Sequence, residues 1–272
     1  MNFLGKIIAC VNEKGGVSKT TTVKNVSTGL AKKGKKVLAI DLDASANLTA
    51  ALGFDESEID KNIVGIFNKT MNFEEVEEGF GILSHKENID IITSCDELHT
   101  IESNLSNSME RETVLRRYLA NIKDKYDYIF IDCPAGLGLY VINALFCADS
   151  IIIPTQPHAL SINAFQNVIK ILRQVQILNK TYGTAFLKPT IMGVLFTQVK
   201  KNTVNDNKIM DIVRKEYNIP TFKTIIPNTT KITESDACGK SIYAYTPGST
   251  ISLIFQDLVE EILDLEKKGD DK

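Results

Sequence analysis

The chain lacks features that mark several classes of protein: it has no tryptophan, only three histidines and no long apolar run. A membrane-spanning helix needs ~18 or more apolar residues in succession, and no segment approaches that length, so we expect no membrane span. The five cysteines are scattered without a C-x-x-C pair, and their odd number argues against a disulfide framework. These absences predict a protein of the reducing cytoplasm.

What the chain does contain is enough apolar material for one large core. Of its 272 residues, 43% are hydrophobic and 24% are charged, which is typical of globular domains. We therefore expect a single domain over residues 1–267, followed by a short polar tail over residues 268–272.

The charges are unevenly distributed, although the net charge of −3 gives the whole chain no nucleic-acid signature. Residues 55–112 contain fifteen acidic and four basic side chains, a balance of −11, which leaves +8 for the remainder. Two ordinary solvated surfaces of opposite sign would give this pattern. So would a protein with one face that meets an anionic polymer.

The most informative stretch is Asn12–Thr21, with the sequence NEKGGVSKTT. The apolar run Ile7–Val11 predicts a buried strand before it, and an amphipathic helix is expected over Thr20–Lys32 after it. Strand, glycine-rich turn and helix N-terminus in this order favour a phosphate-binding loop, because bared backbone N–H groups and the helix dipole attract an anion. A Gly/Lys-rich turn without a ligand is the alternative.

The residue types in this loop predict separate roles. Lys19 would reach the β- and γ-phosphates of a nucleotide, and the Thr20 hydroxyl would bind Mg²⁺. The strict G-x-x-x-x-G-K-[ST] pattern is not met, because Asn12 and Glu13 replace its leading glycine and Ser18 replaces its last one. If that last position needs a positive φ, Ser18 is strained by on the order of 1 kcal/mol.

Lys14, directly before the glycine pair, gives the loop a second lysine. The loop thereby resembles the deviant Walker A motif, K-G-G-x-x-K-[ST], of the ParA/MinD class of P-loop ATPases. The resemblance implies that Lys14 crosses a dimer interface to the ATP of the other subunit, where it would act in catalysis together with Lys19. It also implies that ATP is held by the residues Lys14, Gly15, Gly16, Val17, Ser18, Lys19, Thr20 and Thr21.

Two aspartates, Asp41 and Asp43, stand at the end of a second apolar run, residues 35–41. Ligands of parallel sheets bind beyond the carboxyl ends of the strands, so both carboxylates are expected near the phosphate loop. The segment resembles the switch I motif D-x-D-P-Q-x-N of ParA-like proteins, with Ala44 and Ser45 in place of Pro-Gln. The resemblance implies that Asp43 orients the attacking water and helps to hold Mg²⁺, whereas helix capping is the alternative.

A third motif lies at residues 126–134, where an apolar run ends in Asp132. This is the Walker B arrangement, in which the carboxylate holds Mg²⁺ through water. The turn that follows contains Gly136 and Gly138 and corresponds to switch II, since glycine permits the backbone to move.

The other periodic segments alternate between strands and helices. Strands are expected at 88–94, 149–157, 190–197 and 223–227, and helices at 62–68, 73–78, 97–106, 111–123, 139–147, 161–179, 204–217 and 246–266. This alternation predicts an α/β fold with a doubly wound, mostly parallel sheet flanked by helices.

The segment at 226–235 resembles the family sequence I-P-R-x-V-R-x-S-E-A, which helps to form the nucleotide-base pocket and carries DNA contacts. The resemblance implies that Pro227 and Asn228 bind the nucleotide, although Asn228 replaces the first arginine. Lys231 stands at the second arginine. Our hypothesis for the DNA-binding residues is the set Lys200, Lys201, Lys231 and Lys240.

The resemblance extends from Ile7 to about Leu265 and implies a ParA/Soj-type partition ATPase. Such a protein hydrolyses ATP slowly with Mg²⁺, sandwiches ATP in a homodimer and binds DNA non-specifically on the nucleoid. A ParB-type centromere-binding partner stimulates hydrolysis, which releases DNA during plasmid or chromosome segregation. The last ten residues mix acids with lysines, which disfavours a membrane-docking tail like that of MinD.

Two other functions remain open. The chain could be a related regulatory ATPase that places a protein complex without DNA. It could also be a weakly hydrolysing nucleotide-binding variant, because Ser18, Ala44 and Ser45 depart from the family pattern around the expected catalytic centre.

Overall fold

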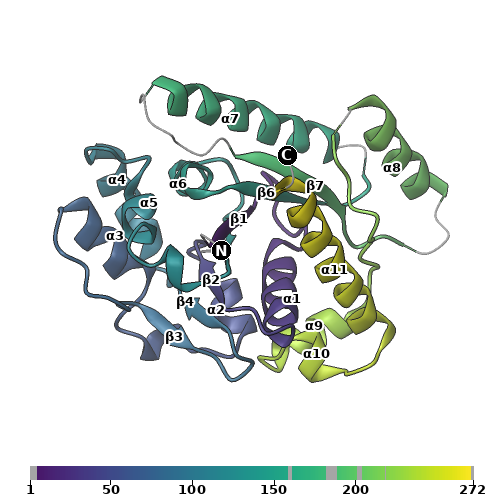
Figure 1. Ribbon diagram of the computed structural model, residues 1–272, viewed down its shortest axis with the longest axis horizontal. Helices are drawn as coiled ribbons and strands as arrows, with labels where there is room; N and C mark the ends of the chain where they lie inside the picture. Colours follow the sequence, from purple (N-terminus) through teal and green to yellow (C-terminus); the bar gives the residue numbers. More distant parts are fainter. Residues whose placement is uncertain (1–4, 159–160, 182–188, 201–203, 218, 271–272) are drawn as a thin grey trace.

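The computed structural model describes residues 5–158, 161–181, 189–200, 204–217 and 219–270. Within these residues, seven strands form one sheet in the order β3-β4-β2-β5-β1-β6-β7, with helices on both sides (Figure 1). Neighbouring strands are parallel, except that β3 pairs antiparallel with β4 at one edge. The strands are β1 (Lys6–Cys10), β2 (Val37–Asp41), β3 (Ile82–Ser84), β4 (Asp90–Ile92), β5 (Tyr128–Asp132), β6 (Ser150–Thr155) and β7 (Thr190–Phe196).

Two groups of helices cover the two faces of the sheet. The first group is α3 (Ile63–Met71), α4 (Leu98–Asn107), α5 (Val114–Leu119), α6 (Leu139–Cys147), α7 (Ser161–Thr181) and α8 (Val204–Glu216). The second group is α1 (Lys19–Lys32), α2 (Asn47–Ala51), α9 (Thr230–Ala237), α10 (Ile242–Tyr245) and α11 (Thr250–Asp270). Two single-turn 3₁₀ helices, η1 (Glu56–Glu58) and η2 (Lys123–Lys125), lie in connections.

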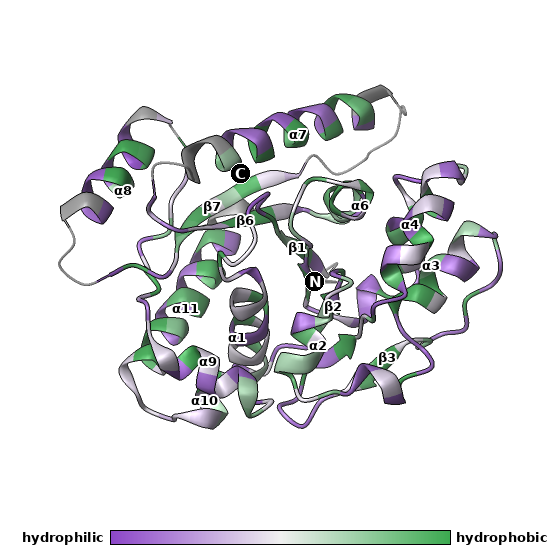
Figure 2. Cartoon of the chain, turned by 180° about the vertical axis from the view of Figure 1, so that it is seen from behind, coloured by the Kyte–Doolittle hydropathy of each residue, from purple (hydrophilic) through white to green (hydrophobic). Residues whose placement is uncertain are grey.

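The core has two layers because successive side chains of a strand point to opposite faces. In β1, Ile7 and Ala9 pack beneath the first helix group, whereas Ile8 and Cys10 pack beneath the second. The strands are therefore apolar on both faces, and the central ones are largely green in Figure 2. Helices α7 and α11 instead carry alternating green and purple turns, as expected for helices with one buried face.

The register of the sheet brings the ends of its central strands to one level. Cys10 at the end of β1 lies beside Asp132 of β5 and beside Ile152 of β6, and Asp41 of β2 also lies beside Asp132. The loops that leave β1, β2 and β5 therefore open at the same edge of the sheet, which is where parallel sheets bind ligands.

The prediction of a doubly wound, mostly parallel α/β sheet is confirmed, but the helix expected at 73–78 is wrong. Phe73 has a φ of +56°, which ends the helical path after α3. The residues that follow are Glu74, Glu75, Val76, Glu77 and Glu78. Their like charges would repel one another on a helix, and they offer no apolar stripe for packing.

The strand expected at 223–227 is also wrong. The segment makes only an isolated bridge, at Pro227, in the part of the chain that the structure describes. Lys223 and Thr224 donate their backbone N–H groups to the carboxylate of Glu261 on α11, at 2.7 and 3.0 Å. At these two residues a side chain therefore takes the place of a neighbouring strand as hydrogen-bond acceptor, whereas Ile226 donates its backbone N–H to the Phe196 carbonyl oxygen of β7 at 2.9 Å.

A buried ion pair joins α1 to α9. The side chain of Lys24 is completely buried, and its ammonium pairs with Asp236. It also donates to Ser235 Oγ at 3.3 Å and to the carbonyl oxygen of Lys240 at 2.8 Å. Burial lowers the pKa of Lys24, and the Asp236 carboxylate opposes that shift. The three acceptors thus keep a costly buried charge satisfied.

We expect the two members of this pair to differ in their effect on stability. Asp236→Ala leaves a buried ammonium without its anion and should lower the free energy of unfolding by about 2 kcal/mol. This value is below the ~3–5 kcal/mol of a fully buried pair because Asp236 is partly exposed. Lys24→Met leaves only a carboxylate that water can reach and should cost less than half as much. Urea unfolding followed by circular dichroism measures both values, and an equal or larger loss for Lys24→Met would contradict this account.

Candidate functional site

A pocket of about 660 Å³ opens at the carboxyl edge of the central strands. Its walls are formed by residues from the stretches 15–21, 43–51 and 227–236, together with Ala135 and Gln198. Its volume is typical of sites for small molecules. The structure therefore brings together the phosphate loop, the segment after β2 and the segment before and within α9.

The phosphate loop turns tightly into α1. Gly16 has a φ of +70° and Ser18 a φ of +69°, so the position that usually holds glycine is left-handed here too. For a residue with a Cβ this conformation costs roughly 1–2 kcal/mol. We expected Ser18 to be strained if its φ were positive. The observed φ fulfils that condition.

Lys19 extends along the inside of the loop and is nearly buried. Its ammonium donates to the carbonyl oxygens of Asn12 and Lys14, each at 3.2 Å. Asn12 is itself fixed by its amide, which donates to the carbonyl oxygen of Pro154 at 2.7 Å and accepts from the Lys14 backbone N–H at 2.9 Å. A positive charge is therefore held at the N-terminus of α1, where the dipole also favours an anion.

Thr20 and Asp132 meet behind the loop. The Thr20 hydroxyl donates to Asp132 Oδ2 at 2.6 Å, and the Asp132 side chain is almost fully buried. Within the described residues, Asp132 Oδ1 has no hydrogen-bond partner. Burial raises the pKa of Asp132, and the nearby Asp41 carboxylate raises it further. A buried carboxylate oxygen without a partner, next to a threonine hydroxyl, is a donor set that fits Mg²⁺.

The two aspartates after β2 have different environments. Asp43 lines the pocket, and one of its oxygens accepts the Ser45 backbone N–H at 2.9 Å, so it both faces the pocket and stabilises a turn. Asp41 is fully buried and accepts the Thr49 hydroxyl and backbone N–H, at 2.8 and 2.9 Å. Burial raises the pKa of Asp41 to about 6. Asp41 therefore anchors α2 rather than facing a ligand.

The structure places most of the expected nucleotide-binding residues on the pocket wall. These residues are Gly15, Gly16, Ser18, Lys19, Thr20, Thr21, Pro227 and Asn228. Val17 differs, because its side chain is buried and its carbonyl oxygen accepts the Thr197 hydroxyl at 3.0 Å. The Lys14 side chain leaves the pocket, and its ammonium donates to Gln156 Oε1 at 3.3 Å.

Sequence reasoning missed Gln156 and Gln198, which follow β6 and β7. Both side-chain amides contact the phosphate loop. The sequence contained a signal, because both glutamines come after apolar strands. The parallel pairing of β1 with β6 and of β6 with β7 places the ends of these strands at the same edge of the sheet. Only the strand order shows that they meet there.

Two of the expected DNA-binding lysines, Lys200 and Lys231, lie on segments next to the pocket wall. Lys200 is exposed and follows Val199, whose carbonyl oxygen accepts the Asn228 N–H at 3.0 Å. Lys231 is exposed on the first turn of α9 and pairs with Glu234 at 2.8 Å. Lys240 is exposed after the same helix, and Lys201 lies outside the described residues.

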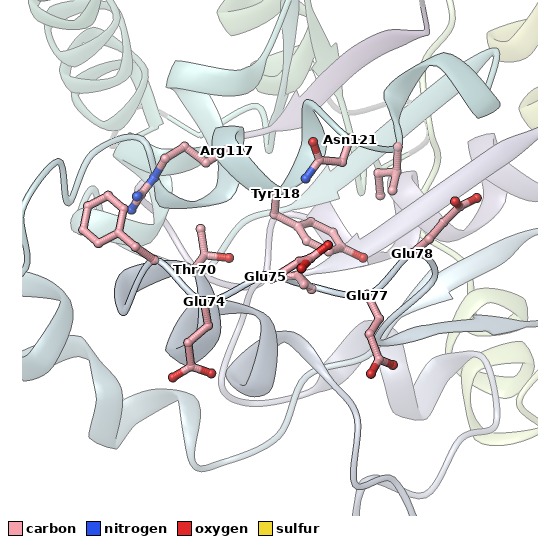
Figure 3. Close-up of a pocket in the computed structure, with 11 residues that line it drawn as sticks. Thr70, Glu74, Glu75, Glu77, Glu78, Arg117, Tyr118 and Asn121 are labelled. Carbon is pink, nitrogen blue, oxygen red and sulfur yellow. The ribbon is translucent and has the colours of Figure 1, made fainter.

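A second cavity, of about 470 Å³, lies between α5 and the glutamate-rich segment after α3 (Figure 3). Arg117, Tyr118 and Asn121 form one side, and the glutamates form the other. The Arg117 guanidinium lies over the Phe73 ring, 4.4 Å from its centroid. All of the residues that line this second cavity lie between residues 70 and 122. Its acidic side disfavours a phosphate ligand.

No helix in the described ranges combines the length and the apolar character that crossing a membrane requires.

Comparison with known proteins finds relatives among partition ATPases. A family model described as an AAA domain matches residues 5–183. The chain is 34% identical to the sporulation initiation inhibitor protein Soj of Bacillus subtilis (strain 168), over 95% of this chain and 98% of that protein. It is 29% identical to the chromosome-partitioning ATPase Soj of Treponema pallidum (strain Nichols), over 96% of this chain and 98% of that protein.

Solved structures share the architecture. Cobyrinic acid a,c-diamide synthase from Mycobacterium smegmatis, with a bound ATP analog and magnesium, superposes with a TM-score of 0.78. The two sequences are 25% identical, and the match covers 97% of each chain.

The raised pKa of Asp41 predicts a pH dependence of stability. Between pH 3.8, the ordinary pKa, and about pH 6, the Asp41 carboxyl is ionised to a greater extent in the unfolded protein than in the folded protein. Its contribution to stability is therefore present below pH 4 and lost as the pH rises through about 6. We expect the free energy of unfolding of the wild type, relative to Asp41→Asn, to fall by about 2 kcal/mol over this range.

Urea titrations of nucleotide-free protein in EDTA, at several pH values, measure this difference. Because the Asp41 carboxylate also raises the pKa of Asp132, the same pair is compared in an Asp132→Asn background, where the subtraction isolates Asp41. A difference that stays constant from pH 4 to pH 7 would contradict the assignment.

Proposed function

Because the chain belongs to the ParA/Soj-type family of P-loop ATPases, we propose that it is a partition ATPase that binds ATP with Mg²⁺ and hydrolyses it slowly. Its ATP-bound homodimer would bind DNA without sequence preference on the nucleoid, in the cytoplasm. A ParB-type partner would stimulate hydrolysis and release DNA during plasmid or chromosome segregation. The observation that supports this most is the convergence of Lys19, Asp43 and Asp132 at the carboxyl ends of three neighbouring strands.

The phosphate loop supports binding of the triphosphate. Gly15 and Gly16 are exposed beside the pocket, and they leave the backbone open to a close approach. The Lys19 ammonium is held by two neutral carbonyl oxygens. A phosphate oxygen makes a stronger, charge-assisted hydrogen bond and can replace them.

Thr20 and Asp132 would hold Mg²⁺, which supplies charge neutralisation for the phosphates. The partnerless Asp132 Oδ1 supports this assignment, since a cation would satisfy it. Asp43, which lines the same pocket as Thr20, would orient the attacking water. Such positioning of a nucleophile and its proton contributes ~10²–10⁴-fold to enzymatic rates.

Lys14 supports the proposed dimer. In the single chain its ammonium contacts the neutral Gln156 side chain at the long distance of 3.3 Å. The triphosphate of a second subunit is a stronger partner, so the lysine can exchange one for the other. A cation supplied by a neighbouring protein is worth ~10³–10⁵ in rate in other P-loop enzymes.

The lysines near α9 support the DNA proposal. Lys200 and Lys231 lie on segments that meet through the hydrogen bond between Asn228 and Val199. Both are exposed, and such side chains bind phosphates without reading bases. A change in the nucleotide pocket would reach them directly because Asn228 also lines that pocket.

One observation favours the alternative of a positioning ATPase that does not use DNA. The Lys231 ammonium is paired with Glu234, which cancels much of its charge at the place where DNA would bind. A separate observation favours the weakly hydrolysing variant: the left-handed Ser18 stores strain in the loop that must hold the phosphates.

Hydrolysis measurements test the ATPase. We expect Lys14→Ala and Asp43→Ala each to lower kcat at least 100-fold, with non-specific DNA present, because one removes a transition-state charge and the other the group that orients water. Phosphate release is measured at saturating ATP. Lys36→Ala and Asp257→Ala are matched controls, since both side chains are exposed away from the pocket, and they should retain the wild-type rate. Equal rates for the wild type, Lys14→Ala and Asp43→Ala would remove both assigned roles.

DNA binding is tested by its salt dependence. Lys200→Gln and Lys231→Gln should each reduce the slope of log K against log salt by about 1, for any DNA sequence, in the presence of ATP. Fluorescence anisotropy with two unrelated duplexes measures the slopes, and Lys36→Gln is the matched control. Unchanged slopes in both variants would exclude these lysines. ATP hydrolysis without any DNA binding by the wild type would instead support the positioning ATPase.

A further inference from the structure

Two glutamines bind the same carbonyl oxygen of the phosphate loop. Gln156 and Gln198 donate their side-chain N–H groups to the Gly16 oxygen, at 3.0 and 2.7 Å. Gln156 also donates to Gln198 Oε1 at 2.8 Å, and Gln156 Oε1 accepts from Lys14. Each amide orientation is thereby fixed, because reversing either one would bring two oxygens together.

Gln198 makes one further contact, to the strained residue of the loop. Its side-chain amide lies 3.1 Å from Ser18 Oγ. Ser18 has a φ of +69° where a glycine would be unstrained. The hydroxyl that makes this contact belongs to the very residue whose Cβ disfavours the conformation.

The backbone at Gln198 is held firmly in position. Thr197, its neighbour, donates its hydroxyl to the Val17 carbonyl oxygen at 3.0 Å, and Val199 on the other side donates to the Ile226 carbonyl oxygen at 3.1 Å. Gln198 itself has a φ of +52°, and its side-chain amide contacts the loop at the Gly16 carbonyl oxygen. A residue in an unusual conformation persists only where its surroundings hold it, so the hydrogen bonds of Thr197 and Val199 make Gln198 a fixed point for the loop.

From these contacts we propose that Gln198 is a positioning residue that compensates for Ser18, holding the phosphate loop in its left-handed turn so that it is preorganised for the triphosphate. This inference rests on the proposed binding of ATP. Gln156 assists by orienting Gln198 and by linking the arrangement to Lys14. A loop with glycine in place of Ser18 would need no such support, because glycine adopts a positive φ freely.

The proposal makes the effect of Gln198 depend on residue 18. Gln198→Ala should raise the KM for ATP about tenfold and change kcat less than twofold, since it acts on the loop before the chemical step. Ser18→Gly supplies the unstrained background, and its own KM is the reference for the double variant. In the double variant, KM should stay within about twofold of Ser18→Gly. Gln174→Ala, an exposed glutamine on α7, is the matched control and should match the wild type.

A second readout does not require ATP. Thermal unfolding of the four nucleotide-free proteins should show that Gln198→Ala lowers Tm more in the wild-type background than in the Ser18→Gly background. Equal losses of Tm together with equal rises of KM in the two backgrounds would overturn the proposal. If wild-type protein failed to bind a fluorescent ATP analogue, the proposed function would fail, and the Tm comparison would still decide whether Gln198 supports Ser18.

Discussion

The parallel pairing of β1 between β5 and β6 is the constraint on which the rest of the site depends. Because β1 is central, the loop that leaves it has the ends of other strands on both sides. From β5 it receives Asp132, which fixes Thr20, and from β6 and the strand beyond it receives Gln156 and Gln198. The phosphate loop is therefore shaped as much by its neighbours across the sheet as by its own glycines.

Much of this arrangement could be predicted from local sequence, because apolar runs of five or six residues followed by Gly or Asp mark both the strands and their ligand-bearing ends. Four short α-helices and strands were not predicted, namely β3, α2, α9 and α10, which have between three and eight residues. The equally short β4 and α5 were predicted because apolar residues continue beyond them, over 88–94 and 111–123. The failures at 73–78 and 223–227 have a different cause. At 73–78 the left-handed backbone angle of Phe73 overrides the local pattern, and at 223–227 a contact with the distant Glu261 overrides it.

The contacts within the site were less predictable than its members. Asp41 and Asp43 look alike in sequence, yet one is buried on Thr49 and the other lines the pocket. The difference arises from α2, which turns Thr49 back toward the sheet, and α2 has no sequence signal of its own. Likewise, the left-handed angle of Ser18 is visible only in the folded backbone. Residue types indicate which chemistry is possible. The packing of elements that are distant in the sequence decides which of two similar residues, such as Asp41 and Asp43, faces the ligand.

The buried lysine of α1 has a consequence for how this chain can exchange parts with its relatives. Lys24 and Asp236 are separated by 212 positions in the sequence but share one charge-neutral site. Consider a recombinant whose amino-terminal part comes from this chain and whose carboxyl-terminal part comes from a relative with an apolar residue at position 236. It would contain the buried Lys24 ammonium without an anion beside it. The reverse recombinant would expose a solitary carboxylate to water and fold more easily. Exchange of the two parts is therefore tolerated better in one direction than in the other. Positions 24 and 236 are expected to be inherited together.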